Sequence, residues 1–202
     1  MKTKLTLLIV VLFGTAAAQS FKSGQVDINL GYGLANTFIA KAYTVSMPGT
    51  SVTLDLGISS ALSLGIYGGL AKAKYELHGI ANCNSGQGNG NFAYEYTYTQ
   101  EATHVIIGVR GAYHFTASGS NEKLDAYGGL MLGNDFESDK YSTITTPFCD
   151  KDEGIHSPYE NYDGFAWSVF AGVRYRFSDH FGVFGELGYG ITVVNVGLNI
   201  KL

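Results

Sequence analysis

Proline, cysteine, charge and long apolar runs are all scarce in this chain of 202 residues. It holds three prolines and two cysteines, and charged residues make up only 15% of it, against about 25% in typical soluble domains. Beyond the N-terminal segment no apolar run approaches the roughly 18 residues of a transmembrane helix, which excludes a helical membrane protein. The formal net charge of −4 argues against nucleic acid as a partner.

Glycine and aromatic residues are abundant instead. The chain has 27 glycines, and aromatics account for 13% of its residues. Glycine is interleaved here with Tyr, Leu and Val, a pattern that favours closely packed strands over flexible linkers.

The N-terminus has the organisation of a secretory signal peptide. Lys2 and Lys4 precede the apolar run 5–13, and small residues follow at 14–18. This order predicts cleavage after Ala18 and export. We therefore expect a signal peptide over residues 1–18 and one domain over residues 19–202, a length that suits a single domain.

Apolar and polar residues alternate through eight segments of strand length. The last of them places Val196, Leu198, Ile200 and Leu202 on one face up to the end of the chain. A terminal strand leaves backbone groups unpaired unless another strand covers it, so we expect it to pair with the first. The eight predicted strands are 25–34, 51–59, 62–75, 98–115, 124–133, 165–177, 181–189 and 195–202.

Short and long connections alternate between these strands. The long ones are 36–50, 76–97 and 134–164, whereas the last, near Gly190, is a tight turn. The pattern predicts an all-β fold, an eight-stranded antiparallel up-and-down transmembrane β-barrel with short periplasmic turns and long extracellular loops. The polar face is too small and too sparsely charged for a soluble surface, so we expect the apolar face to meet lipid. The expected aromatic girdles are Tyr113, Phe115, Tyr175, Phe177 and Phe181 beside the short turns, and Tyr32, Trp167 and Tyr189 at the other rim.

The chain resembles a known family through four features. These are the signal peptide, the eight alternating strands, the Tyr-Gly-Gly-Leu segments at 67–70 and 127–130, and a C-terminal pattern formed by Asn195, Gly197, Ile200 and Leu202. Together they resemble the small bacterial outer-membrane β-barrels of the OmpA-transmembrane, OmpX and OmpW type, a porin-like family. Many members end in Phe where this chain has Leu202. The resemblance implies a place in the bacterial outer membrane, contact with outer-membrane lipids and insertion by the barrel assembly machinery.

Charged residues on the predicted inner face should pair, because the lumen of a small barrel holds little water. We expect a structural lumen network with Glu186 facing Arg174 as its leading pair. Eight strands enclose a space that side chains fill, so a wide aqueous channel is not expected, although a transport role is the alternative to a structural one. The predicted members are Arg110, Arg174, Arg176, Glu186, Asp27, Asp55 and Asp125.

Other reactive side chains carry weaker signals. Cys83 and Cys149 lie in neighbouring predicted loops of an exported chain, which suggests a disulfide, and their flanks lack metal-ligand spacing. His78, His104 and His156, with Ser157 and Asp150, raise the hypothesis of a lipid-modifying enzyme, but no motif supports catalysis. The acidic run 150–153 lacks the spacing of a calcium loop. We expect no metal, no cofactor and no enzymatic activity.

Three functional hypotheses follow. The first is a non-enzymatic barrel that supports the envelope or presents loops 76–97 and 134–164 to ligands outside. Within the first loop, Tyr94, Tyr96 and Tyr98 alternate with polar residues and suggest a strand that extends beyond the membrane. The second hypothesis is a narrow pore or a conduit for small solutes, and the third is the lipid-modifying enzyme.

Overall fold

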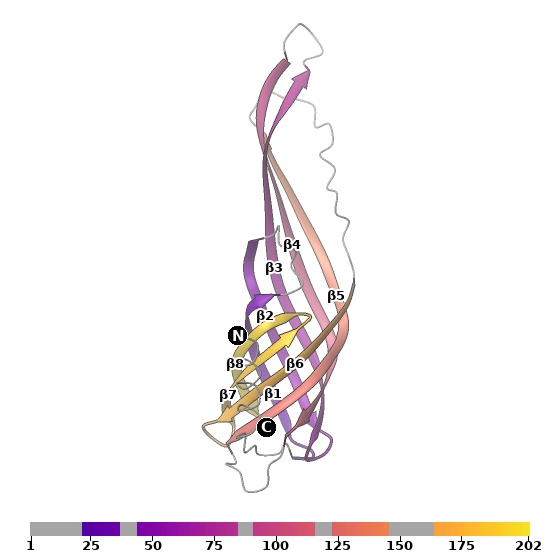
Figure 1. The fold of residues 1–202 in the computed structure, drawn as a ribbon, viewed down its shortest axis with the longest axis vertical. Coiled ribbons are helices and arrows are strands. Elements are labelled where there is room, and N and C mark those ends of the chain that lie inside the picture. Colours follow the sequence, from indigo (N-terminus) through magenta and orange to yellow (C-terminus); the bar gives the residue numbers. More distant parts are fainter. Residues whose placement is uncertain (1–21, 37–43, 85–90, 116–122, 146–163) are drawn as a thin grey trace, which may run out of the picture.

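Eight antiparallel strands close into one barrel (Figure 1). The structure, a computed structural model, describes residues 22–36, 44–84, 91–115, 123–145 and 164–202. Strands follow one another around the barrel in chain order, so the predicted up-and-down barrel is confirmed. Their bounds are β1 Val26–Asn36, β2 Thr44–Gly57, β3 Leu62–Asn84, β4 Asn91–His114, β5 Leu124–Thr145, β6 Gly164–Arg176, β7 Phe181–Tyr189 and β8 Thr192–Lys201.

The first and last strands close the cylinder. β1 pairs with β8 in a register that sets Ile28 opposite Ile200 and Asn29 opposite Asn199. The predicted pairing of the two terminal strands is therefore correct. Closure satisfies the backbone groups of both strands, and a spanning sheet needs this because hydrocarbon offers no hydrogen-bond partners.

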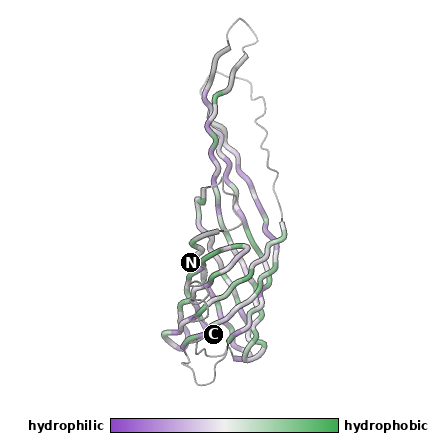
Figure 2. The backbone as a smooth tube through the Cα atoms, viewed as in Figure 1, coloured by the Kyte–Doolittle hydropathy of each residue, from purple (hydrophilic) through white to green (hydrophobic). Residues whose placement is uncertain are grey.

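The two faces of the sheet differ in polarity. Outward side chains such as Leu54, Ile66 and Val109 are exposed, whereas the inward Asp27 and Asn199 are fully buried. Figure 2 shows the hydrophobic residues concentrated on the barrel, with hydrophilic ones along the strands that leave it. This apolar-out, polar-in arrangement is that of a barrel in lipid. No helix in the parts of the chain that the structure describes is long and apolar enough to cross a membrane.

Three strands continue far beyond the others. β3 and β4 stay paired from Leu62 opposite Tyr113 to Asn84 opposite Asn91, and β5 accompanies β4 as far as Thr145. They form a sheet that projects beyond one end of the barrel (Figure 1). We call this sheet the β3–β5 extension (residues 71–84, 91–104 and 135–145). The predicted long connections were too long, because residues 44–50, 76–84, 91–97 and 134–145 belong to strands that pair without an apolar outward face. The predicted strand that extends beyond the membrane around Tyr94, Tyr96 and Tyr98 is confirmed as part of β4.

The predicted aromatic girdles fall at both ends of the barrel surface. Tyr113 and Phe115 are exposed beside a short connection and meet edge to face, with ring centroids 5.4 Å apart. At the other rim, Trp167 and Tyr189 lie 5.8 Å apart. The tight turn that precedes β8 contains Gly190 at φ +115°, a conformation that glycine adopts readily.

Candidate functional site

The lumen is crossed by a buried ion-pair cluster centred on Arg110. Nη2 of Arg110 donates to Oε1 of Glu186 at 2.8 Å, and its Nε lies 3.3 Å from Oδ1 of Asp55. The guanidinium also covers the ring of Phe170, 4.2 Å from its centroid. Tyr127 donates its hydroxyl to the same oxygen of Glu186 at 3.0 Å. The cluster therefore ties β4 to β2, β5, β6 and β7 across the barrel.

Gly65 makes room for this cluster. It lies between Asp55 and Arg110 in one row of the sheet, paired with Asp55 on β2 and with Arg110 on β4. A Cβ at Gly65 would lie 2.3 Å from Oδ1 of Asp55 and 2.4 Å from the carbonyl oxygen of Leu54. Any larger residue here would push Asp55 away from Arg110.

A second cluster surrounds Arg174 nearer the chain termini. Arg174 donates to Asp27 and, at 3.2 Å, to Asp125. Arg176 donates to Asp27 at 2.9 Å, and Gln25 donates to both oxygens of that carboxylate. In these two clusters three arginines face four carboxylates, and all seven side chains are buried.

The sequence-based choice of leading pair was wrong. Glu186 bonds Arg110 rather than Arg174. The register explains the difference, because Glu186 lies opposite Gly172 while Arg174 lies opposite Asp125 on its other neighbour, β5. The alternation along a strand predicts which side chains face the lumen. The ion-pair partner of each one depends on the register of the strands and on how far the side chain extends across the lumen.

A Ser-His-Asp arrangement in the lumen was missed by the sequence analysis. Oγ of Ser63 lies 2.9 Å from Nε2 of His114, and Nδ1 of His114 lies 2.9 Å from Oδ1 of Asp125. The signal was present, since all three residues lie on the polar face of predicted strands. Ser63, His114 and Asp125 are each at most 3% exposed, so the hydroxyl is closed to a substrate and the three serve as a buried hydrogen-bond chain.

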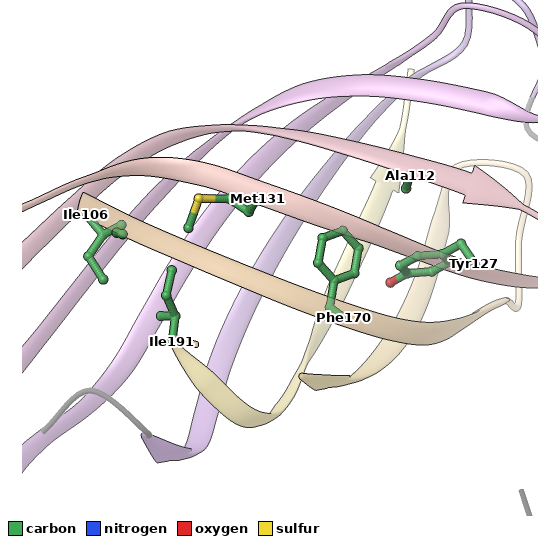
Figure 3. Packing of buried hydrophobic residues seen from close by; sticks show 7 residues of the cluster. Ile106, Ala112, Tyr127, Met131, Phe170 and Ile191 are labelled. Atoms are coloured by element: carbon green, nitrogen blue, oxygen red, sulfur yellow. The ribbon is translucent and has the colours of Figure 1, made fainter. Parts of the chain in front are cut away.

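Apolar side chains fill the lumen beyond the charged clusters. Ile106, Met131, Phe170 and Ile191 belong to one packed cluster, with Tyr127 at its end beside Phe170 (Figure 3). The cavity next to them, lined by Tyr67, Arg110, Met131 and Glu186 among others, has a volume of about 20 Å³. That is room for about one water molecule. The lumen beside this apolar cluster therefore holds little free space.

The outer mouth of the barrel carries an acidic group on its inner side. His104 lies just beyond the outermost apolar row, and its Nδ1 is 2.9 Å from Oδ2 of Asp135. Burial alone would lower the pKa of His104, but the hydrogen bond to Asp135 and the charges of Asp135, Glu137 and Asp139 raise it above the ordinary value. Asp139 also accepts hydrogen bonds from Gln100 and Tyr141 at 2.9 and 2.8 Å.

The remaining predicted residues are spread over the molecule. Asn195 of the C-terminal pattern is buried in the lumen beside Glu186, with its Nδ2 3.5 Å from Oε2 of Glu186. Gly197 and Ile200 lie on β8, and Leu202 follows that strand and is exposed. His78 contacts Thr97 on the extension, with 3.0 Å between Nδ1 and the hydroxyl. The enzyme candidates Asp150, His156 and Ser157 lie outside the described residues.

The disulfide stays a prediction. The backbone of Cys83 belongs to β3, opposite Phe92, and not to a loop, whereas Cys149 lies outside the described residues. Among the residues that the structure describes, no group of three or more His, Cys, Asp or Glu side chains is placed to hold a metal ion.

Several solved structures are similar to this chain. The N-terminal β-barrel domain of OprF from Pseudomonas aeruginosa aligns with a TM-score of 0.50 at 12% identity, over 90% of this chain and 100% of that one. Ail, the attachment invasion locus protein of Yersinia pestis, aligns at 0.43 and 13%, over 89% and 95%. OprG from P. aeruginosa aligns at 0.42 and 11%, over 92% and 99%. At these identities the OprF domain supports the fold alone.

The sequence itself identifies the family. No curated protein matches the chain, but residues 5–200 match the family model described as "Outer membrane protein beta-barrel domain". That range covers nearly the whole chain and includes β1 to β7 and all of β8 except its last residue, Lys201. With its closed barrel, apolar exterior and buried polar residues in the lumen, the chain belongs to the outer membrane protein β-barrel domain family.

Proposed function

We propose that this protein is a non-enzymatic outer-membrane barrel that presents its β3–β5 extension to ligands outside the cell. The observation that carries the proposal is the combination of buried ion pairs that meet across the lumen with strands that continue far beyond the lipid-facing band. A conduit needs a continuous open path, and an enzyme of this kind needs an accessible nucleophile. An extended sheet instead adds surface on one side of the membrane only.

The contacts across the lumen and the small cavity beside them argue against the pore alternative. Arg110, Glu186 and Phe170 meet across the barrel, and the cavity beside them holds about 20 Å³. Folded protein in a planar bilayer should therefore give no conductance steps. Steps of constant size that depend on protein concentration, and that change in the Arg110→Ala variant, would establish a pore and overturn this part of the proposal.

The charge of the extension indicates what kind of ligand it suits. Six described carboxylates on it outnumber three lysines, which favours basic or neutral groups over polyanions. Ail is described in complex with a heparin analogue, a class of ligand that this acidic surface would repel. The carboxylates are Glu76, Glu95, Glu101, Asp135, Glu137 and Asp139, and the lysines are Lys72, Lys74 and Lys140.

Binding of simple charged probes would test this preference. The full chain in lipid nanodiscs should bind a lysine-rich peptide, more weakly as salt rises, and should not bind heparin. Combining Asp135→Asn, Glu137→Gln and Asp139→Asn should abolish peptide binding. A combination of Asp179→Asn and Lys22→Gln near the opposite rim is the control. Heparin binding by the unaltered chain would contradict the proposed ligand class.

Export and insertion are part of the proposal. Residues 1–18 would be removed during export, and the pattern around Asn195, Gly197, Ile200 and Leu202 would be read by the barrel assembly machinery. A mature N-terminus at Gln19, found by mass spectrometry of outer-membrane protein, would support cleavage. An intact Met1 in that fraction would refute it.

Labelling of intact cells would test the direction of the barrel. An epitope inserted between β3 and β4 should be labelled on intact cells, because the extension lies outside. The same epitope inserted in the turn between β6 and β7, after Ser178, should be labelled only after permeabilisation. The reverse pattern would place the extension in the periplasm and refute the proposed presentation to outside ligands.

A further inference from the structure

The lipid-facing surface of the barrel carries an apolar hollow that is lined by residues of β1 to β6. One row of the sheet there runs Val52, Gly68, Ile107, Asn134 and Phe165, as the register of five adjoining strands shows. The row below contains Leu54, Ile66, Val109 and Leu132. These side chains line a shallow apolar hollow of about 880 Å³.

The hollow exists because two members of the row are small or short. Gly68 has no side chain, and a Cβ added there would meet only Cγ1 of Val52, at 3.5 Å, and a carbonyl oxygen at 4.0 Å. A second apolar hollow of about 370 Å³ adjoins it and is also lined by Gly68, with Leu70 and Val105. Asn134 puts an exposed amide among apolar neighbours, where it needs a polar partner because hydrocarbon supplies none.

Between the hollow and the extension, the outward side chains change from apolar to polar within two rows of the sheet. Leu70, Val105 and Phe136 form an apolar row. The next row places Lys72, Thr103 and Ser138 side by side, and all three point outward because the strands run without a register shift. The Lys72 row lies about 13 Å along the strand from Gly68, at about 3.3 Å per residue.

All three lysines of the extension lie on its outward side, together with Glu76, Glu95 and Glu101. Lys140 lies in the row above, next to Glu101, which separates it from Lys74, and Lys74 is neutralised by Glu76 at 2.6 Å. The carboxylates of Asp135, Glu137 and Asp139 lie on the opposite, inner side. An ammonium group with two neighbouring hydroxyls is a donor set suited to phosphate oxygens.

We propose that this surface is a specific site for one molecule of the phosphorylated, acylated glycolipid of the outer leaflet. An acyl chain occupies the hollow over Gly68, its ester or amide carbonyl accepts a hydrogen bond from Asn134, and a phosphate is held by Lys72 with Thr103 and Ser138. The order of apolar hollow, apolar row and cationic row matches the order of groups along such a lipid.

A second copy of the barrel fits this surface less well. Two copies in one membrane are related by an axis along the membrane normal. Residues at the same depth in the membrane therefore face each other in a symmetric contact. Lys72 of one copy would then approach Lys72 of the other, and like charges oppose association. A lipid phosphate is negatively charged and would attract Lys72. The acyl chain of the lipid is flexible and can follow a shallow surface.

Native mass spectrometry of the folded full chain in mild detergent would test the site, with lipid A as the probe. We expect one bound molecule. Lys72→Glu should weaken binding about thirtyfold, since one lysine near a charged membrane surface contributes about 1 kcal/mol, charge reversal doubles the change, and about 1.4 kcal/mol is tenfold. Gly68→Leu should also weaken binding, because its side chain would occupy the hollow. Gly111→Leu and Lys22→Glu are matched controls. Gly111 faces lipid between Leu64 and Leu130, away from the hollow, and Lys22 is exposed at the other rim.

Two further probes identify the source of the binding energy. Lipid A without its phosphates should bind more weakly than lipid A to the unaltered chain, and Lys72→Glu should not weaken its binding further. Phosphatidylglycerol should bind more weakly than lipid A. Equal binding of all three lipids, unchanged binding by Gly68→Leu, or a dimer that excludes lipid would each overturn the proposal. Heat-dependent gel mobility of every variant verifies that the barrel is folded.

Discussion

Replacing Arg110 by Met should be among the most destabilising single changes in this protein. The substitution keeps most of the side-chain volume but removes the cation that lies 2.8 Å from Glu186 and 3.3 Å from Asp55. Glu186 then loses its printed ion pair, whereas Asp55 keeps Arg174 at 3.8 Å and the amide of Asn29 at 3.0 Å. Removing one partner of a buried ion pair costs about 3–5 kcal/mol, and the lost contact with Phe170 adds about 1 kcal/mol.

Urea unfolding in phospholipid vesicles, followed by gel mobility, would measure the loss. With a slope of about 2 kcal/mol per molar urea, a loss of about 4 kcal/mol lowers the midpoint by about 2 M. The triple variant Arg110→Met, Asp55→Asn, Glu186→Gln removes the unpaired charges and should recover most of that loss. Arg176→Met is the milder control, because Asp27 keeps Arg174 and Gln25 as donors.

Two outcomes would refute the reasoning. If Arg110→Met lowered the free energy of unfolding by less than about 1 kcal/mol, the typical value of an exposed pair, the lumen would contain enough water to solvate both carboxylates. If the triple variant were as unstable as the single one, the cost would come from lost packing and not from unpaired charge.

Three further predictions concern single sites. Ser63 should not react with a fluorophosphonate probe in folded protein, and labelling that disappears in His114→Ala would instead reveal a nucleophile. Because its pKa is raised, protonated His104 should stabilise the fold fully below its ordinary pKa of about 6.5 and lose this contribution as pH rises through the folded pKa. Asp135→Asn should lower that pKa in an NMR titration, and no shift would contradict the assigned cause. Gly65→Ala should destabilise the barrel by about 1–3 kcal/mol, since it displaces Asp55, whereas Gly111→Ala, which has room for a methyl group, serves as the control in the same urea titration.

Alternation along the sequence was enough to predict the barrel because lipid imposes it on every spanning strand. β6 and β7 lie within one residue of their predicted bounds, and both consist almost entirely of the spanning part. β3, β4 and β5 were predicted too short for the same reason. Beyond Leu70 and Phe136 no lipid selects apolar outward residues, so the period-two signal fades while backbone pairing continues.

The site was predictable only as a set of residues. The alternation of side chains along each strand predicted which residues face the lumen, and Asp27, Asp125 and Arg174 are indeed buried together. Which cation meets which carboxylate was not predictable, because Arg110 and Glu186 are 76 residues apart and meet across the lumen. The hollow over Gly68 was equally hidden, since it depends on which residues of five strands share a row.

The contact between Arg174 and Asp27 has a consequence for how the chain assembles. It joins the sixth strand to the first across 147 residues of sequence, so it forms only once the cylinder has closed. An open sheet that entered the bilayer early would carry three arginines and four carboxylates into hydrocarbon with several still unpaired, at a cost of a few kcal/mol each. The ion pairs thus penalise partial insertion, and they make closure and membrane entry a single cooperative event.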